Sequence, residues 1–357
     1  MMRVGFDGKR YFNNKTGLGN YSREIVHALA AQFPDDEFVL FSETENKPFV
    51  EFKNLSVFTP KKKGLFWRVF GMAKTAAAQK IDVFHGLSNE LPTGLKKYGI
   101  RSVVTIHDVI FKRYPGFYPL TDRLIYNWKT KNALRNADVV VATSHATAAD
   151  IQNYYPSFSG KCEVVYQPVQ QIFYDTIPKK SLEESPYFIY VSGFSHRKNH
   201  GTLIEAFAAI QNLCDWNLYL VGASGNTLDE VKKFVDHEKL GTRIRVITDP
   251  ETRDLMHLMK HASAFVYPSL FEGFGIPLAE AAVCGLPMAV SDIPVFRELA
   301  GDAAFYFHPN KFREMADALL RLTQSEHSIF LKSSNPEILK EIERNHIAKH
   351  LMKIYRN

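Results

Sequence analysis

Cysteine is scarce in this chain, and long apolar runs are missing. The 357 residues include three cysteines, Cys162, Cys214 and Cys284. They lie far apart and fit no metal-ligand spacing, which suits a reducing compartment and ordinary burial. The opening residues MMRVGFDGKRYF enter a strand-like pattern without the apolar region of a signal peptide, and no run approaches the length of a bilayer span. We therefore expect a cytoplasmic protein.

Acidic and basic residues are nearly balanced in this sequence, with a small basic excess. Lysine and arginine number 44 against 38 aspartates and glutamates, which gives a net charge of +6. This excess raises the question of an anionic partner, such as nucleic acid, a membrane or a phosphorylated substrate. The basic residues are scattered, and no helix-turn-helix, zinc-finger or RNP-like signature is present, so we do not expect nucleic acid as a partner.

Short apolar runs alternate with helix-like stretches, and the length favours two domains. This alternation is typical of parallel sheets in α/β proteins. The first series predicts strands at 2–7, 38–43, 82–86, 102–108, 138–144 and 162–166, with helices at 19–33 and 120–137. A polar, proline-bearing linker at 167–186 precedes a second series, with strands at 187–193, 216–222, 243–248, 264–269 and 285–292. We expect two doubly wound α/β domains whose ligand lies at the carboxyl ends of strands in a cleft between them.

A pair of glycines precedes a helix in the segment TGLGNYSREI, residues 16–25. Gly17 and Gly19 begin the pattern of a dinucleotide fingerprint, but its third glycine position is Ser22 and a long loop separates the glycines from the first strand. The segment is therefore a poor NAD motif. Amides at the start of a helix suit a phosphate, and a flexible loop whose glycines merely permit the turn explains the pattern equally well.

Arg197 and Lys198 follow a strand of the second series, in VSGFSHRKNHGTLI, residues 191–204. Two adjacent cations at the carboxyl end of a strand can neutralise a diphosphate, arginine through forked hydrogen bonds and lysine as a point charge. For an isolated Arg-Lys pair a solvated basic loop is the better interpretation. Their position after the strand favours the diphosphate.

Two glutamates bracket a glycine-rich turn in FEGFGIPLAE, residues 271–280. The pattern predicts a buried strand, a loop and a helix that starts near Pro277, so that Glu272 precedes the turn and Glu280 lies about one turn into the helix. Carboxylates on either side of a row of amide donors suit a ligand with hydroxyls at two places and a phosphate between them, as in a nucleotide sugar. The alternative is that Glu280 caps its helix and Glu272 is exposed.

These residues resemble the retaining GT-B glycosyltransferases of glycosyltransferase family 4. EGFGIPLAE matches the family's E-x7-E motif, and four more segments fall in the family's order, namely TGLGNYSRE, TIHDVIF, GFSHRKN and SDIPVFRELAGDAAFYFHP. The resemblance covers nearly the whole chain, and the joint occurrence of these motifs is specific. It implies two facing Rossmann-like domains, at 1–170 on the acceptor side and at 171–342 for the nucleotide sugar, with a last helix at 343–357 that crosses back to the first domain.

The resemblance also implies roles for individual residues. Glu280 holds the ribose hydroxyls and Glu272 contacts hydroxyls of the transferred sugar. Arg197 and Lys198 form the diphosphate clamp. The other donor-binding residues, mostly through backbone amides, are Gly19, Gly193, Phe274, Gly275 and Ile276.

On the first domain, His107 in TIHD matches the position that reaches the sugar and the reaction centre, and Asp108 is assigned to the acceptor side. A lone histidine at a strand end is more often structural than catalytic, so the role of His107 follows from the family order. One departure concerns Phe194, because many members carry an arginine at that position. The clamp then depends on Arg197 and Lys198.

The family implies a metal-independent reaction that retains anomeric configuration, and no Asp-x-Asp motif is placed to hold Mg²⁺. We therefore expect no metal and no cofactor besides the nucleotide-sugar donor. DVFHGLSNELP and the general pattern resemble bacterial mannosyltransferases, which makes mannose from GDP-mannose the first choice, transferred to a glycan or lipid-linked acceptor in cell-envelope polysaccharide synthesis. The alternative is a catalytically inactive partner subunit that binds nucleotide sugar. An NAD-dependent enzyme is disfavoured by the missing third glycine.

Residues 60–80, PKKKGLFWRVFGMAKTAAAQK, combine basic and large aromatic side chains. Such a helix can lie in the interface of an anionic membrane through Lys61, Lys62 and Lys63 and the neighbouring aromatics. An ordinary amphipathic helix that packs its aromatics on the first sheet explains the same spacing. The family resemblance moves the balance slightly towards a peripheral location at the inner face of the cytoplasmic membrane.

Overall fold

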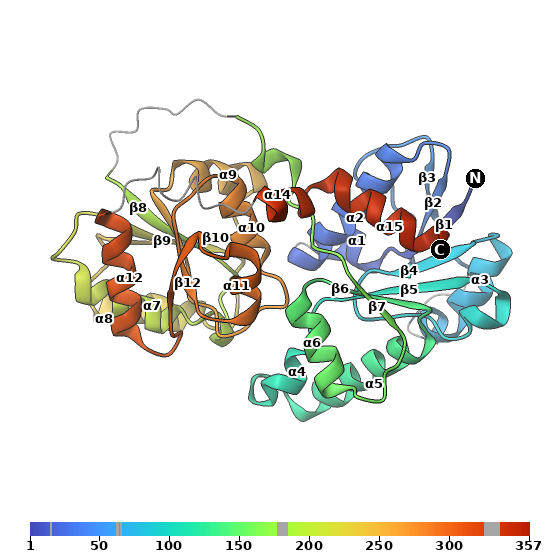
Figure 1. Ribbon diagram of the computed structural model, residues 1–357, viewed down its shortest axis with the longest axis horizontal. Coiled ribbons are helices and arrows are strands. Elements are labelled where there is room, and N and C mark those ends of the chain that lie inside the picture. The colour runs from blue at the N-terminus through green and yellow to red at the C-terminus, as the bar shows by residue number, and fades with distance from the viewer. Residues whose placement is uncertain (15, 62–63, 65, 177–184, 325–335) are drawn as a thin grey trace. The chain divides into compact units, whose positions relative to one another are not determined.

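The computed structural model describes residues 1–14, 16–61, 64, 66–176, 185–324 and 336–357. The chain divides into two compact units (Figure 1). The first unit contains Met1–Pro168 and Glu341–Asn357, and the second contains Val169–Lys340. Among the residues just given, no helix is both long enough and apolar enough to cross a bilayer.

The first unit is built on a seven-stranded parallel sheet, in the order β3-β2-β1-β4-β5-β6-β7. Its strands are β1 (Arg3–Asp7), β2 (Glu37–Phe41), β3 (Leu55–Phe58), β4 (Val83–Gly86), β5 (Arg101–Ile106), β6 (Val139–Ala142) and β7 (Lys161–Val164). The central strands β4 and β6 are buried along their whole length. This burial on both faces explains their nearly continuous apolar sequence.

Helices cover both faces of this sheet. Successive residues of a strand point to opposite faces, so each strand contributes to two cores. In β2, Phe38 and Leu40 join a core with the helices α2 and α15, whereas Val39 and Phe41 join a core with α3, α5 and α6. The longer helices of this unit are α2 (Gly17–Gln32), α3 (Met72–Ala78), α5 (Leu120–Asn136), α6 (His145–Tyr154) and α15 (Arg344–Arg356). Short helices are α1 (Lys9–Asn13), a π-helical turn at Trp67–Gly71, α4 (Ile110–Arg113) and 3₁₀ turns at Leu95–Tyr98 and Pro115–Phe117.

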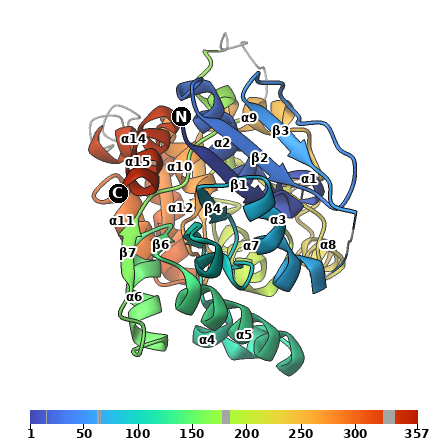
Figure 2. The ribbon, with the colours of Figure 1, turned by 90° about the vertical axis from the view of Figure 1, so that its right-hand side faces the viewer.

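The last helix belongs to the first unit although it ends the chain. Figure 2 shows α15 beside α2, against which it packs. The Tyr355 hydroxyl lies 2.6 Å from His85 Nδ1 in the middle of the sheet, so a buried hydrogen bond ties α15 to β4. The short α14 (Pro336–Glu341) precedes α15.

The second unit has a six-stranded parallel sheet, in the order β10-β9-β8-β11-β12-β13. Its strands are β8 (Tyr187–Val191), β9 (Asn217–Gly222), β10 (Ile244–Thr248), β11 (Ala264–Tyr267), β12 (Met288–Ser291) and β13 (Ala304–Phe307). Its helices are α7 (His200–Ile210), α8 (Leu228–His237), α9 (Thr252–His261), α10 (Ile276–Val283), α11 (Pro294–Ala300) and α12 (Phe312–Gln324), with 3₁₀ turns at Gln171–Phe173 and His196–Lys198.

Each sheet has a point at which the strand order reverses, between β1 and β4 in the first unit and between β8 and β11 in the second. At such points the loops after the two strands diverge and leave room for a ligand. The segments after β8 and β11 carry the Arg-Lys pair and the E-x7-E motif. The fold therefore puts both motifs at the reversal point of one sheet.

The predicted α/β class with two Rossmann-like, doubly wound sheets is confirmed. The strands β3 and β13 were not among the predicted strands. The predicted helix at 60–80 corresponds to the π-helical turn Trp67–Gly71 and α3, while Lys62, Lys63 and residue 65 lie outside the described residues. The predicted linker at 167–186 also falls partly outside them, at 177–184.

Candidate functional site

Three charged side chains from two loops meet in the second unit. Arg197 and Lys198 lie in the 3₁₀ turn after β8, and Glu272 lies in the loop after β11. Arg197 Nη1 lies 3.2 Å from Glu272 Oε2, and Lys198 Nζ forms an ion pair with Glu272 Oε1. The Arg197 carbonyl also accepts a hydrogen bond of 2.9 Å from the Leu270 amide, which joins the two loops. The predicted clamp and the first glutamate of the motif are thus one cluster.

Burial controls the charge state of this cluster. Glu272 and Lys198 are both buried, whereas Arg197 is partly exposed. Burial alone would raise the pKa of the Glu272 carboxyl, but the charges of Lys198 and Arg197 outweigh it and lower the pKa to about 2. Lys198 Nζ also lies 3.3 Å from the Tyr267 hydroxyl. Glu272 is therefore a fixed carboxylate, and the alternative in which Glu272 is exposed is wrong.

Glu280, the second glutamate of the motif, has an electrostatic environment opposite to that of Glu272. It lies in the second turn of α10 and is buried. No hydrogen bond or ion pair to its side chain is found within the described part of the chain. Burial raises the pKa of the Glu280 carboxyl to about 8. A buried carboxyl without a protein partner is costly, and hydroxyl groups of a ligand are partners that would satisfy it.

The turn between the glutamates requires glycine at position 275. Gly275 has a φ of +95°, in the left-handed region that side chains disfavour. A Cβ there would also lie 2.9 Å from the Phe296 ring. Pro277 stands in the first turn of α10, where its missing N–H costs no hydrogen bond. The sequence thus fixes a helix start close to Phe274, Gly275 and Ile276.

Phe194, the departure from the family pattern, is a core residue. Its ring is buried and stacks on the His200 ring, with centroids 4.7 Å apart. Its amide donates to the Ala223 carbonyl at 3.1 Å, next to Gly193. Phe194 therefore supplies packing at a position where many family members have a cation.

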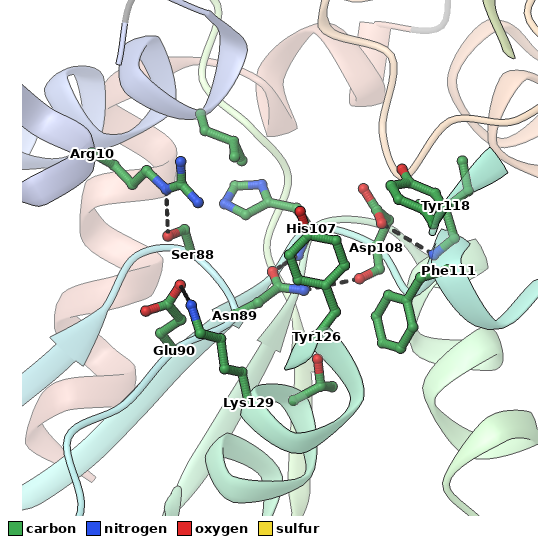
Figure 3. A pocket seen from close by; sticks show the side chains of 13 residues that line it. Arg10, Ser88, Asn89, Glu90, His107, Asp108, Phe111, Tyr118, Tyr126 and Lys129 are labelled. Carbon is green, nitrogen blue, oxygen red and sulfur yellow. Dashed lines mark hydrogen bonds and ion pairs between the residues drawn. The ribbon is translucent and has the colours of Figure 1, made fainter. Parts of the chain in front are cut away.

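The first unit contains a pocket at the carboxyl ends of its strands, drawn in Figure 3. Its volume is about 200 Å³. The lining residues come from the helices α1, α2, α4 and α5, from the loops after β4 and β5 and from the segment before α5, namely Arg10, Leu18, Ser88, Asn89, Glu90, His107, Asp108, Ile110, Phe111, Tyr118, Tyr126, Lys129 and Thr130. The pocket combines three aromatic rings with charged and amide groups, a composition typical of small-molecule sites.

His107 lines this pocket as a neutral ring with both nitrogens engaged. Its Nε2 lies 2.8 Å from the Leu87 carbonyl, which can only accept, so Nε2 carries the proton. Its Nδ1 lies 3.2 Å from Gln167 Nε2 and accepts from that amide. Burial lowers the pKa of His107 to about 4. In this arrangement His107 is a positioned polar group and a poor proton donor at neutral pH.

Asp108 also lines the pocket, where its side chain supports the start of α4. Asp108 Oδ1 accepts from the Ile110 amide at 3.1 Å, and the Asp108 carbonyl accepts from Asn89 Nδ2 at 2.9 Å. Asn89 Oδ1 in turn accepts from the His107 amide at 3.0 Å. These bonds hold the loops after β4 and β5 against each other.

Gly19 occupies a tight position in the first turn of α2. A Cβ at this residue would lie 1.8 Å from the Asn14 carbonyl oxygen, so no other residue fits without a backbone shift. The Gly19 amide donates to Thr16 O at 2.9 Å and to Asn14 Oδ1 at 3.0 Å. A phosphate at this amide would have to replace the Asn14 side chain.

A chain of ion pairs runs from Arg68 into the lining of the pocket, and no sequence pattern predicted it. Arg68, from the π-helical turn, pairs with both Asp7 and Glu90, and Glu90 also accepts from Lys129 at 2.9 Å. The pocket residues Ser88–Glu90 closely follow the predicted strand at 82–86, and Arg10 closely follows the predicted strand at 2–7. The rule that ligands lie at the carboxyl ends of strands could therefore have found them. Lys129, inside the helix α5, had no such signal. Within the described ranges, no group of three His, Cys, Asp or Glu residues could hold a metal ion.

Comparison with protein families identifies the chain. A family model described as Glycosyltransferase Family 4 matches residues 15–170, and one described as Glycosyl transferases group 1 matches residues 174–342. The chain belongs to glycosyltransferase family 4. Together the two matches cover both compact units, and the segments that carry the E-x7-E motif and the Arg-Lys pair lie inside the second match.

Curated relatives of this family 4 member include two O-antigen enzymes. O-antigen chain mannosyltransferase B of Escherichia coli is 28% identical over 345 residues, which cover 87% of this chain and 88% of that protein. O-antigen chain mannosyltransferase RfbU of Salmonella typhimurium is 29% identical over 232 residues, which cover 63% of this chain and 62% of that protein.

Solved structures with the same fold cover the whole chain. Sucrose-phosphate synthase from Thermosynechococcus elongatus has a TM-score of 0.79 at 18% identity, covering 100% of this chain and 98% of that one. Anabaena Alr3699/HepE, solved in complex with UDP and glucose, has a TM-score of 0.73 at 18% identity and full coverage of both chains. At these identities the likeness establishes the fold, which is that of GT-B glycosyltransferases.

Proposed function

We propose that this glycosyltransferase moves mannose from GDP-mannose, with retention of anomeric configuration and without a metal ion, to a glycan or lipid-linked acceptor in cell-envelope polysaccharide synthesis. The family match supports the reaction class. The names of the similar O-antigen enzymes support the sugar and the pathway. The reaction would take place in the cytoplasm or at the inner face of the cytoplasmic membrane.

The observation that supports the proposal most directly is that the two glutamates of the E-x7-E segment have opposite electrostatic environments. Glu272 is a permanent carboxylate held by two cations, and Glu280 is a buried carboxyl without a protein partner. A nucleotide sugar offers ribose hydroxyls to Glu280, a diphosphate to Arg197 and Lys198, and sugar hydroxyls to Glu272. Each of these groups would then be satisfied on binding.

Departure of the nucleoside diphosphate builds negative charge on the leaving oxygen. Arg197, Lys198 and the N-terminus of α10 would stabilise this charge, because fixed donors act strongly in a site with little water. Since the pKa of Glu272 is about 2, this carboxylate cannot donate a proton at neutral pH. Its role is to orient the sugar through accepted hydrogen bonds. The leaving phosphate is the proposed base for the acceptor hydroxyl, on the same face of the sugar.

The acceptor sugar would lie in the pocket of the first unit. Phe111, Tyr118 and Tyr126 offer apolar ring faces, and Glu90 and Lys129 offer hydrogen-bonding partners for hydroxyls. His107 and Asp108 would position the reacting hydroxyl group. The ion pairs of Glu90 with Arg68 and Lys129 keep its carboxylate ionised, because these cations outweigh burial and lower the pKa of Glu90.

A panel of nucleotide sugars tests the proposal. Binding is measured by calorimetry, and slow hydrolysis of each donor is followed by release of the nucleoside diphosphate. We expect GDP-mannose to bind most tightly and to be hydrolysed. Binding of a donor without any hydrolysis or transfer would point to an inactive partner subunit. Tighter binding of a UDP-sugar would show that GDP-mannose is not the donor.

A further inference from the structure

The helix α5 exposes a row of large apolar side chains. Leu120, Leu124 and Trp128 follow one another at four-residue intervals, so they lie on one stripe of the helix, and Ile125 flanks it. Leu120 and Leu124 are more than 60% exposed, and Ile125 and Trp128 are 50% exposed. The opposite side of the helix is buried through Thr130, Ala133 and Leu134. Single exposed apolar residues are ordinary, but a contiguous row of this kind marks an interaction surface.

The same stripe turns basic in the last turns of α5. After Trp128 it continues through Lys131 and Arg135, which are both exposed. Lys112 on α4 faces two cations of α5, because after burial the charges of Lys131 and Arg123 lower the pKa of Lys112. None of these four cations has an ion pair within the described ranges. In residues 110–136, Asp122 is the one acidic residue.

Apolar side chains that merge into unpaired cations fit the interface of an anionic bilayer. The apolar residues can enter the boundary between headgroups and acyl chains while the cations meet anionic headgroups. A second copy of this chain fits less well, because the identical stripe offers these cations no row of carboxylates, Asp122 being the one acidic residue in 110–136. Figures 1 and 2 both draw α5 next to α4 at the periphery of its unit.

The stretch at 60–80 is a weaker candidate. Phe66 and Phe70 are exposed, but Trp67 is buried in the core of the first unit, where its Nε1 donates to Thr75 Oγ1 at 3.1 Å. The helix α5 is also tied to the pocket, because Tyr126, Lys129 and Thr130 line it (Figure 3). A membrane bound along α5 would therefore bring the pocket close to the lipid surface.

We infer that the exposed stripe of α5, from Leu120 to Arg135, together with Lys112 and Arg123, docks the protein on anionic phospholipid and presents the pocket to a lipid-linked acceptor. This inference rests on the proposed function, since it names the surface and the class of acceptor for the same pocket. It moves the membrane contact from the lysines at 61–63 to α5.

Vesicle flotation with the whole chain tests the inference. The probe is phosphatidylcholine vesicles with about 30% phosphatidylglycerol, compared with phosphatidylcholine alone, at about 50 mM and about 500 mM salt. Two double variants remove the apolar part, Leu124→Ser with Trp128→Ser, and the basic part, Lys131→Ser with Arg135→Ser. Matched controls from the second unit are Leu213→Ser and Lys233→Ser, both at exposed positions. A Lys61/Lys62/Lys63→Ser variant tests the rival stretch.

We expect the wild type to float with phosphatidylglycerol vesicles at low salt, and each α5 variant to lose about tenfold or more of its partitioning. The controls and the variant at 61–63 should float like the wild type. The inference is overturned if the wild type does not float, if the α5 variants float unchanged, or if the loss occurs only in the variant at 61–63. A lipid-free dimer that the Leu124/Trp128 variant abolishes would show instead that the stripe joins two copies.

A nucleotide titration on the same samples separates this inference from the proposed function. The α5 variants should bind GDP like the wild type, since their substituted residues lie outside the donor cluster in the second unit. Far-UV circular dichroism and thermal unfolding like those of the wild type show that their first unit is folded. Loss of vesicle binding with normal GDP binding supports the docking surface. A wild type that floats without binding any nucleotide would contradict the proposed function and leave the docking surface standing.

Discussion

Arg197 and Lys198 are the single residues on which transfer is expected to depend most directly. Replacing either with Ala should slow transfer by about 2 to 4 kcal/mol of transition-state stabilisation, the loss typical of one removed donor to developing charge. Lys233→Ala, an exposed lysine of the same unit, is the control. Steady-state kinetics with GDP-mannose measure the effect, and wild-type turnover in both variants would rule out the clamp.

Glu280 is expected to bind the nucleotide through its ribose. The substitution Glu280→Gln keeps the shape but cannot become an anion, so GDP binding should weaken by roughly 1.5 to 3 kcal/mol. Calorimetric titration with GDP measures the change, with the exposed Glu251→Gln as control. Unchanged affinity would leave Glu280 with a structural role only.

The raised pKa of Glu280 also predicts a pH dependence of binding. Without ligand, Glu280 keeps its proton up to about pH 8. Ribose hydroxyls donate more strongly to the carboxylate, so binding should favour the ionised form and release a proton. GDP affinity should therefore rise with pH towards 8 and then level off. The Glu280→Gln variant should lack this rise, and a wild-type affinity that falls over the same range would contradict the assignment.

The sequence predicted some features of these residues and could not predict others. The seven-residue spacing of Glu272 and Glu280 is local, so the turn and the helix start between them could be read directly. The ion pairs of Lys198 and Glu272 join residues 74 positions apart, and nothing local indicates them. The opposite charge states of the two glutamates follow from burial and partners, which spacing does not reveal.

At the scale of elements, the start of α10 is the feature that arranges the donor site. The substitution Gly275→Ala should destabilise the protein by about 1 to 3 kcal/mol, because a side chain is strained at a φ of +95° and its Cβ would press on the Phe296 ring. We also expect weaker GDP binding, since the turn positions the amides near Ile276. Thermal unfolding and calorimetry measure the two effects. Gly241→Ala, at an open loop position with ordinary φ, should be nearly neutral.

The two strands missed by the sequence patterns are both edge strands, although the edge strands β7 and β10 were predicted. β3 and β13 each lie at an edge of their sheet, where one flank has no neighbouring strand. Three of the four residues in each are not fully buried, so neither needs the continuous apolar run that marks a central strand. Central strands such as β4 and β6 are buried throughout, and their patterns predicted them directly.

At the scale of the whole molecule, the alternation of strands and helices sufficed to predict two doubly wound units. It could not predict that α15 packs on α2, because an amphipathic helix at the end of a chain can cover any apolar face. The family resemblance supplied that expectation, and the buried bond between Tyr355 and His85 gives its physical basis. The exposed stripe of α5 was not anticipated either, since the same residues could have packed on the sheet.

The reaction itself is tested most directly by following the anomeric proton of GDP-mannose by NMR as the wild type turns it over in the presence of a chelator. The account predicts that the α-anomer appears first in the released or transferred mannose, that the chelator has no effect, and that the Lys198→Ala variant slows the reaction. Initial formation of the β-anomer, loss of turnover on chelation, or no reaction with any nucleotide sugar would contradict it.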